Sequence, residues 1–334
     1  MEFIHSIHAR RVPVGGANVE ITTPMPVLPL SHILITIEAN LLTANTSDNW
    51  PSLLGALRSI QFRWRGTQIW AVSGLDLYRI TRAMGLWYNR PEAAAQGAGA
   101  RRMITLCLPF GRPLYDPMEL FPAVAKGETE LVIAWTAAPS GYNSLIYTIE
   151  SVQIPDVVPK SFLRATTIGL TPAATGDLDV DLPRSAPLLH LGYSVTASEP
   201  VAALATIEQV KILANNQDRG YSLVSNHAAR AMQAYNAPLG LEMDNILHVE
   251  NTAASYTQNA VTLSNVVNLS SASEFGWLPF DFLGDGQFAL QAQTFQDLKA
   301  RITFNTAAAI RLLPIEYWSP AMLSRGGEPA RAAR

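Results

Sequence analysis

Short apolar runs rich in β-branched and aromatic residues, separated by polar or proline-rich turns, dominate the pattern of this chain. Such runs are typical of β-strands, which are usually about five or six residues long. In the first half the predicted strands cover residues 33–39, 60–64, 68–72, 103–108, 130–135 and 144–153. In the second half they cover residues 188–196, 209–213, 221–224, 260–269, 298–304 and 310–318. The pattern therefore predicts an all-β protein.

Helical signals are few and short. Asp116 and Pro117 read as an N-cap followed by proline at the first helical position, and Pro122 limits the length of that predicted helix. Two longer segments, at the same place in each half, also predict helices: residues 75–86 and 226–235. Two segments predict a single turn before a strand: residues 51–57 and 200–205.

Several short segments recur in the same order in both halves. The pairs are Leu-Pro-Phe at 108–110 and 278–280, Thr-Ala-Ala at 136–138 and 306–308, residues 32–39 and 190–197, residues 70–73 and 221–225, and Arg-Ala-Met at 82–84 and 230–232. The first two pairs each lie 170 residues apart (278 − 108 and 306 − 136), so the segment between them has the same length in both halves. A repeat of this length indicates two similar domains in tandem.

Each half spans roughly 130 to 150 residues and is expected to hold about eight short strands, six of which are assigned above. That is the size of a jelly roll, an eight-stranded barrel of two sheets. We therefore predict two tandem eight-stranded jelly-roll barrels with short loop helices. Two immunoglobulin-like sandwiches are the alternative, but such domains are usually nearer about 100 residues. The predicted division is an N-terminal arm (1–16), a first jelly roll (17–155), a linker (156–175), a second jelly roll (176–320) and a disordered C-terminal tail (321–334).

The N-terminal arm has a pattern of its own. Phe3, Ile4 and Ile7 lie at helical spacing, and Arg10 and Arg11 follow them. This pattern predicts a short amphipathic helix suited to an anionic lipid surface or to a groove on a neighbouring molecule. A helix this short is marginal alone, so a terminus without fixed structure is the alternative. These five residues are the candidate contact residues of the arm.

Composition narrows the range of partners. Charged residues make up 15% of the chain, against about 25% in a typical protein, and the net charge is −3. No basic field is present to hold nucleic acid. The single cysteine, Cys107, lies in an apolar run and is interpreted as a buried strand thiol. No segment resembles a signal peptide, so we expect synthesis in a reducing cytoplasm.

Searches for catalytic chemistry mostly fail. The chain contains no Gly-x-Ser-x-Gly elbow, no His-Glu-x-x-His and no Walker-type Gly-x-x-x-x-Gly-Lys. Residues 97–102 begin like a dinucleotide fingerprint but lack its final glycine and do not follow a strand. We therefore predict no enzyme, no catalytic residues and no cofactor.

Two spacings resemble metal sites but lack the remaining ligands. His5 and His8 have ligand-like spacing, yet no cysteine or acidic residue nearby completes a set. Asp177, Asp179 and Asp181 resemble the start of a calcium loop that lacks its glycine and its final glutamate. Aspartates that alternate on the exposed face of a strand explain this segment more simply. The same alternation places the intervening side chains inward: Leu178, Val180 and Leu182.

Histidines and tryptophans are interpreted as structural. His32 and His190 recur at matching positions on apolar strands, where a histidine at a barrel rim is favoured over a catalytic one. Core packing is likewise favoured over a sugar-binding platform for the tryptophans in or beside predicted strands. These are Trp64, Trp70, Trp135, Trp277 and Trp318.

Two consecutive jelly rolls, no catalytic motif, an N-terminal arm and a low-charge surface together resemble one family. The chain is similar to the double jelly-roll major capsid proteins of tailless icosahedral viruses with an internal membrane, of the tectivirus, corticovirus and finnlakevirus types. The resemblance covers about residues 17–320 and rests on architecture and order of elements. It implies a homotrimer that forms a pseudo-hexagonal capsomer, because two barrels in each of three chains give six similar sides.

The resemblance also implies where the protein works. The expected place is a virion capsid, and the expected partners are neighbouring capsomers, penton and minor capsid proteins and internal membrane lipid, without direct contact to nucleic acid. Both chain ends would lie on the interior side of the shell. The longest loop candidates, at 89–102 and 236–256, are too short to predict large outer towers.

A carbohydrate-binding or carbohydrate-active jelly-roll protein, such as a phage tail or lectin-like module, is the competing interpretation. Exposed aromatic residues on one concave sheet beside a pair of carboxylates would favour it. A capsid protein should purify as a trimer or a larger assembly, whereas a monomer that binds glycan would favour the competing interpretation.

Overall fold

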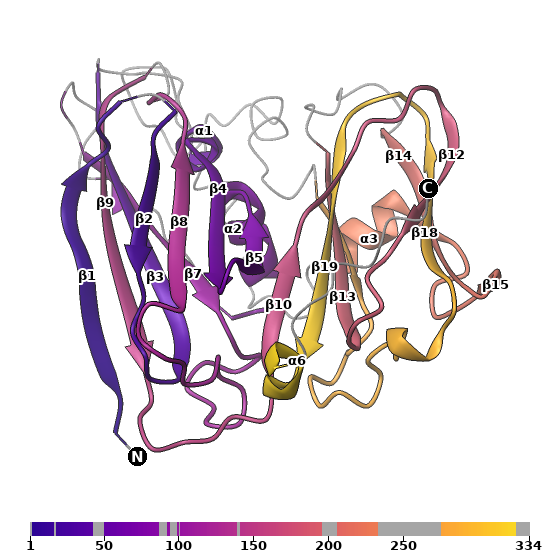
Figure 1. The fold of residues 1–334 in the computed structure, drawn as a ribbon. Helices are drawn as coiled ribbons and strands as arrows, with labels where there is room; N and C mark the ends of the chain where they lie inside the picture. The colour runs from indigo at the N-terminus through magenta and orange to yellow at the C-terminus, as the bar shows by residue number, and fades with distance from the viewer. Residues whose placement is uncertain are drawn as a thin grey trace, which may run out of the picture.

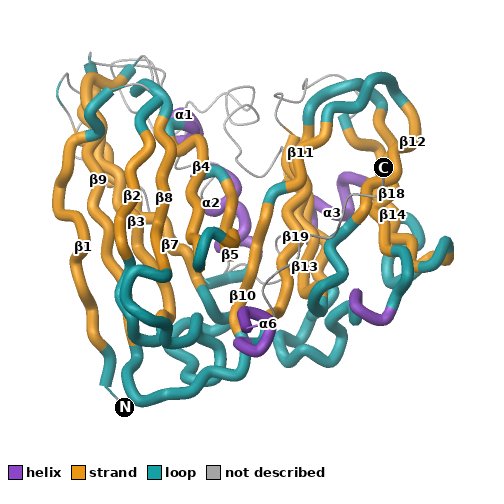
Figure 2. The backbone as a smooth tube through the Cα atoms, in the orientation of Figure 1, coloured by secondary structure: helices purple, strands orange, loops and turns teal. Residues whose placement is uncertain are grey.

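The structure is a computed structural model that describes residues 2–16, 18–42, 50–86, 92–93, 99, 101–138, 141–195, 206–232 and 275–324. These residues form two β-barrels that lie side by side (Figures 1 and 2). The first barrel contains the strands up to β9, and the second begins at β10. The strand predicted at 260–269 and the turn predicted at 200–205 lie outside the described residues.

The first barrel consists of two facing sheets. One has the strand order β1-β9-β3-β7-β6, and the other has the order β2-β8-β4-β5. The strands are β1 (Ile4–Pro13), β2 (Glu20–Pro24), β3 (Leu30–Leu41), β4 (Leu57–Trp64), β5 (Thr67–Val72), β6 (Glu92–Ala93), β7 (Arg101–Pro109), β8 (Thr129–Trp135) and β9 (Tyr142–Gln153).

The second barrel repeats this arrangement. In one sheet β19 lies between β13 and the pair β10 and β11, and β17 lies beyond β13; the other has the order β12-β18-β14-β15, with β16 also paired to β14. The strands are β10 (Phe162–Thr166), β11 (Ile168–Leu170), β12 (Gly176–Asp181), β13 (Leu188–Val195), β14 (Ile207–Ala214), β15 (Gln217–Asp218), β16 (Val224–Ser225), β17 (Phe275–Pro279), β18 (Leu298–Phe304) and β19 (Ile310–Trp318).

Strand register shows that the two barrels are built in the same way. His32 of β3 pairs with Pro109 of β7, and His190 of β13 pairs with Pro279 of β17. Each Leu-Pro-Phe therefore ends the equivalent strand, and each Thr-Ala-Ala follows the next strand, β8 or β18. The predicted duplication and the two tandem jelly rolls are confirmed.

Alternation along the strands produces two cores. On β3 the side chains of Ile33, Ile35 and Ile37 are fully buried inside the first barrel. On β12 the expected inward residue Val180 is buried in the core of the second barrel, as is Leu182 just after the strand, and Leu178 is partly buried against the same core. The alternation of residues 177–182 therefore identified the inner face of this strand.

The helices are short and sit in connections. They are α1 (Trp50–Gly55), α2 (Gly74–Ala83), α3 (Asn226–Met232), the 3₁₀ helix η1 (Ala292–Thr294) and α6 (Pro320–Ser324). Ser73 caps α2, because its side chain accepts a hydrogen bond from the backbone N–H of Asp76. None of these helices, in the part of the chain that the structure describes, is long and apolar enough to cross a bilayer.

The helix predicted from Asp116 is wrong. The Asp116 carboxylate does accept a hydrogen bond from the backbone N–H of Met118, as an N-cap would. The chain then forms turns and an isolated bridge from Glu119 to Ser161 instead of a helix. Backbone contacts with a later segment, such as the bridge to Ser161, outweigh the local N-cap signal of Asp116.

The amphipathic helix predicted at the N-terminus is also wrong. Residues Ile4–Pro13 form β1, which pairs antiparallel with β9 along its length. Ile4 and Ile7 are exposed on this strand, and Phe3 just before it contacts the ring of Tyr115. Arg10 is exposed, and Arg11 pairs with Glu38 at 3.1 Å. The sequence could not reveal β9 as a partner from more than 130 positions away (Ser6 pairs with Ser151).

Two segments, predicted as an arm and as a linker, belong to the barrels. The first residues form the first strand of the first barrel, and the segment 156–175, predicted as a linker, contains β10 and β11, the matching strands of the second barrel. Residues 321–324 of the predicted tail belong to α6, and residues 325–334 lie outside the described residues.

Candidate functional site

The barrels meet along a surface that we call the seam. It is formed by β5, α2 and the loop after β7 from the first barrel, and by β10, β13, β17 and β19 from the second (Figure 1). At its centre β10 pairs in parallel with β5, with Ala165 opposite Trp70 and Thr166 opposite Ala71. One continuous path of eight strands therefore runs from β17 through β10 and β5 to β2, and β11 pairs with β19 beside it.

Apolar side chains fill most of the seam. The outward side of the β10-β19-β13-β17 sheet, which we call the covered face, packs into the same cluster as the first barrel's core. The apolar side chains of the covered face include Phe275, Trp277, Leu313 and Ile315, all of which are buried. Ser194 is a buried polar residue of the same face. Burial of this much apolar surface is the main physical reason that the two barrels hold together.

A buried ionic network crosses the seam at α2. Arg311 of β19 donates to both carboxylate oxygens of Asp76, at 2.6 and 3.1 Å. Arg79 of α2 donates at 2.5 Å to the hydroxyl of Ser194 on β13. Asp76 is fully buried, and it also accepts a hydrogen bond from Ser73. A buried carboxylate needs such partners, so this network fixes the position of α2 against the second barrel.

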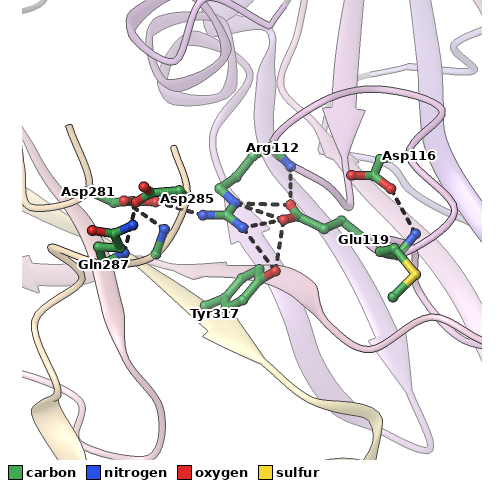
Figure 3. A network of polar contacts seen from close by, with 9 residues as sticks. Arg112, Asp116, Glu119, Asp281, Asp285, Gln287 and Tyr317 are labelled. Carbon is green, nitrogen blue, oxygen red and sulfur yellow. Dashed lines mark hydrogen bonds and ion pairs between the residues drawn. The ribbon is translucent and has the colours of Figure 1, made fainter. Parts of the chain in front are cut away.

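A second network ties the loops at one end of the seam (Figure 3). Arg112 donates to Glu119 at 2.9 Å, to Asp281 of the second barrel at 2.7 Å and to the hydroxyl of Tyr317 at 3.0 Å. The Tyr317 hydroxyl donates to Glu119 at 2.8 Å, and its ring lies 4.5 Å from the guanidinium.

The charges of this second network stabilise one another. Burial opposes ionisation of Arg112 and Glu119, but their mutual hydrogen bonds outweigh it. The pKa of Glu119 is therefore lowered and that of Arg112 is raised. Both groups remain charged at neutral pH, which suits a fixed clamp better than proton transfer.

This clamp was not predicted from the sequence. Arg112 is the second residue after the first Leu-Pro-Phe repeat, whereas Asp281 directly follows the second, so the two charges do not occupy equivalent positions. Asp76 and Arg311 carried no sequence signal either, because 235 positions separate them.

The equivalent side of the first barrel has no such cover among the described residues. We call the outward side of the β1-β9-β3-β7 sheet the open face. Its central side chains are small or apolar and only partly or nearly buried: Leu34, Thr36, Thr105, Ile146 and Thr148. Charged pairs rim it, with Glu38 held by Arg11 and Arg101, and Glu150 held by His5. A low-charge centre with a polar rim is the usual anatomy of a protein interface.

The two repeated histidines occupy equivalent buried places. The ring of His32 lies edge-on to Tyr115, and its Nδ1 lies 3.0 Å from the Ser31 hydroxyl. The ring of His190 stacks on Trp277 with 4.8 Å between centroids. Burial lowers the pKa of His32 to about 4 and that of His190 to about 3, with smaller contributions from His5 and Arg112 respectively. Both imidazoles are therefore neutral at pH 7.

The residues whose spacing resembled metal sites bind other side chains. His5 contacts Glu150 at 2.9 Å and His8 contacts Ser151 at 2.7 Å, so each ring is bound to β9. Asp179 forms a two-point contact with Arg301, which lowers the pKa of its carboxyl. Within the described part of the chain, no three His, Cys, Asp or Glu side chains come together as a metal would require.

The remaining predictions on core residues are confirmed. Cys107 is buried, and burial raises the pKa of its thiol. All five tryptophans assigned to the core are buried: Trp64, Trp70, Trp135, Trp277 and Trp318. They do not form an exposed aromatic platform, so they give no support to carbohydrate binding.

Comparison with known proteins rests on structure alone. No family model matches the chain, and no curated protein matches its sequence. The major capsid protein of Sulfolobus turreted icosahedral virus superposes with a TM-score of 0.67 at 12% identity, covering 98% of this chain and 100% of that one. The chain has the double jelly-roll fold.

Two further capsid proteins share this fold. The major capsid protein P2 of bacteriophage PM2 superposes with a TM-score of 0.58 at 10% identity, covering 95% of this chain and 99% of that one. PBCV-1 VP54 superposes with a TM-score of 0.60 at 12% identity, covering 95% and 94%. Coverage of both chains along almost their full length includes both barrels and the seam.

Proposed function

We propose that this protein is a major capsid protein, a structural subunit without enzymatic activity. The observation that carries the proposal is the pair of equivalent faces. The covered face of the second barrel is buried by the first barrel of the same chain, whereas the open face of the first barrel has the same strands and no cover among the described residues. A second copy of the chain can supply that cover with its second barrel.

This contact is heterologous, and heterologous contacts form rings when the rotation closes. The free sides of the two barrels lie at opposite ends of the molecule in Figure 1, with β1 at one end and β12, β14 and β15 at the other. If the seam between copies repeats the seam within a chain and the rotation closes after six barrels, three copies form a ring. We propose this homotrimer as the capsomer.

Native mass spectrometry and electron microscopy test the proposal. The purified protein is expected at three times the mass of the chain, and imaging of assembled material is expected to show pseudo-hexagonal units in closed shells. A monomer at micromolar concentration that forms neither trimers nor shells under any assembly condition would overturn the proposal.

One end of the molecule has features suited to a lipid surface. Exposed apolar side chains gather in the loops there: Phe3, Val27, Tyr115, Met118, Val158, Phe282, Leu283 and Phe288. Contacts between these loops, such as Phe3 with Tyr115 and the Lys160 backbone with Met118, place several of them together. We propose that this end faces an internal membrane, with Phe3 as the arm residue nearest the lipid.

Flotation with vesicles tests the membrane contact. The double variant Phe282→Ser and Leu283→Ser is expected to weaken binding of the trimer to vesicles made from phosphatidylglycerol and phosphatidylethanolamine. Leu42→Ser is the matched control, because Leu42 is comparably exposed but lies at the other end of β3. Equal flotation of all three proteins would rule out a role for these loops.

Other partners follow from the capsid role. Neighbouring capsomers, penton and minor capsid proteins are the proposed contacts in the virion, and the net charge of −3 argues against direct binding of nucleic acid. The proposed site of synthesis is the host cytoplasm.

A further inference from the structure

The join between the two barrels is a strand pairing as well as a packed surface. β10 pairs with β19 on one side and, in parallel, with β5 on the other. The hydroxyl of Thr167 adds a hydrogen bond of 2.8 Å to the carbonyl of Ala71. The outer strand of one barrel is thus joined edge to edge with the outer strand of the next.

The same two kinds of edge recur at the free ends of the molecule. β1 pairs with β9 as β10 pairs with β19, and β1 ends its sheet. β16 pairs with β14 as β5 pairs with β4, with Val224 opposite Val210 where Val72 is opposite Ile60. β1 is therefore the counterpart of β10, and residues 221–225 are the counterpart of β5.

Register carries this equivalence to single residues. His32 and His190 are equivalent and pair with Val152 and Ile315. His5 is opposite Val152 and Ala165 is opposite Ile315, so Ser6 corresponds to Thr166. Since Val224 corresponds to Val72, Leu223 corresponds to Ala71. The pair Thr166 and Ala71 within the chain thus predicts a pair Ser6 and Leu223 between chains.

Exposure marks the same two edges. On β10 the side chain of Leu163 is fully buried at the seam, whereas its counterpart Phe3, just before β1, is 60% exposed. On β1, the equivalent strand, Ile4 is 42% exposed and Ile7 is 55% exposed, and Leu223 at the other edge is 60% exposed. Among the described residues neither edge pairs with a further strand, and large apolar side chains along such an edge are a template for pairing with another chain.

We propose that β1 of one copy pairs in parallel with residues 221–225 of a second copy, with Ser6 opposite Leu223, so that the sheets run continuously around the capsomer. The inference rests on the proposed trimer and specifies how it closes. It also assigns Ile4 and Ile7 a partner: they lie along the edge that the second copy covers.

Disulfide trapping tests the register. Neighbouring strands lie about 4.8 Å apart, which is within the Cα separation that a disulfide accepts. The double variant Ser6→Cys with Leu223→Cys is expected to form covalent dimers and trimers on mild oxidation, seen on a denaturing gel without reductant. Thr22→Cys with Leu223→Cys is the matched control, because Thr22 is exposed on β2, which belongs to the other sheet of the first barrel. Cys107 is buried and is present in both proteins.

The outcomes separate this inference from the proposed function. Trimers by light scattering without cross-links in the Ser6 and Leu223 variant, or with equal cross-links in the control, would overturn the edge pairing while the capsid proposal stands. A protein that never forms trimers would overturn both.

A substitution supplies a second measurement without cysteines. Leu223→Asp places a charge in the proposed strand junction and is expected to raise the dissociation constant of the trimer at least about tenfold, since a buried leucine is worth roughly 1.5–3 kcal/mol. Leu42→Asp, at a leucine that is 52% exposed, is the control and is expected to leave the trimer unchanged. Equal effects of the two substitutions on a folded protein would count against the junction.

Discussion

The covered face and the open face are the same surface built twice and placed in different surroundings. Phe275 and Trp277 on the covered face occupy the positions of Thr105 and Cys107 on the open face, 170 residues earlier (275 − 105 and 277 − 107). At these two positions the face buried within the chain carries large aromatic side chains, while the open face carries small ones. A permanent contact accepts bulky apolar groups, but a surface that must stay in water before assembly is limited in how many it can expose.

The largest loss of stability is expected from a substitution in the ionic network of the seam. Asp76→Ala should lower the free energy of unfolding by about 3–5 kcal/mol, because it leaves the buried Arg79 without its neighbouring carboxylate and removes the partner of Arg311. Urea denaturation measures this change. Asp179→Ala, which removes an exposed ion pair with Arg301, is the control and should cost far less. Similar losses in both variants would mean that the seam contributes no more than the surface does.

A tryptophan at equivalent positions should separate folding from assembly. Ser194→Trp overfills the covered face and should destabilise the monomer by at least about 3 kcal/mol, the upper end of the usual range for overpacking. Thr36→Trp, at the matching place on the open face, should leave the melting temperature nearly unchanged but prevent trimers. Calorimetry and light scattering measure the two effects. A trimer formed normally by Thr36→Trp would show that the open face is not an interface.

The two buried histidines should make the free energy of unfolding decrease as the pH falls. An unfolded histidine binds a proton near pH 6.5, whereas the lowered pKa values keep His32 and His190 neutral in the fold down to about 4 and about 3. Protons therefore favour the unfolded chain, and each histidine should cost about 2 kcal/mol between pH 7 and pH 5.

Single substitutions separate the two contributions. His190→Gln and His32→Gln should each flatten the dependence of the free energy of unfolding on pH, measured by urea denaturation at a series of pH values. An unchanged slope in both variants would place the proton linkage elsewhere.

The smallest effect is expected at Cys107. Burial raises the pKa of its thiol, so a thiol reagent should label the native protein only as fast as it opens, and label the urea-unfolded chain at once. Cys107→Ala should lower the free energy of unfolding by less than Asp76→Ala or Ser194→Trp does, because it removes one sulfur atom and buries no polar group. Rapid labelling of the native protein would mean that the open face is looser than the covered one.

The alternation of side chains along the strands and the repeated segments of the two halves were sufficient to predict much of the fold. The alternation in the Asp177 to Asp181 segment identified a strand together with its inner face, because strand side chains point to opposite sides in turn. The Leu-Pro-Phe and Thr-Ala-Ala repeats fixed the equivalence of the two barrels, because they mark strand ends. The helix predicted over residues 75–86 corresponds to α2, and Ser73 caps its start in the structure.

Only the tertiary structure decided the roles of the ends and of the seam. The N-terminal segment has apolar residues at helical spacing, yet β9 offers it backbone partners along ten residues and makes it a strand. Asp76 and Arg311, and likewise Arg112 and Asp281, meet because two barrels pack together, and no local pattern encodes a contact over more than 160 positions. Local sequence determines which way a strand faces, whereas its neighbours depend on how the whole chain closes.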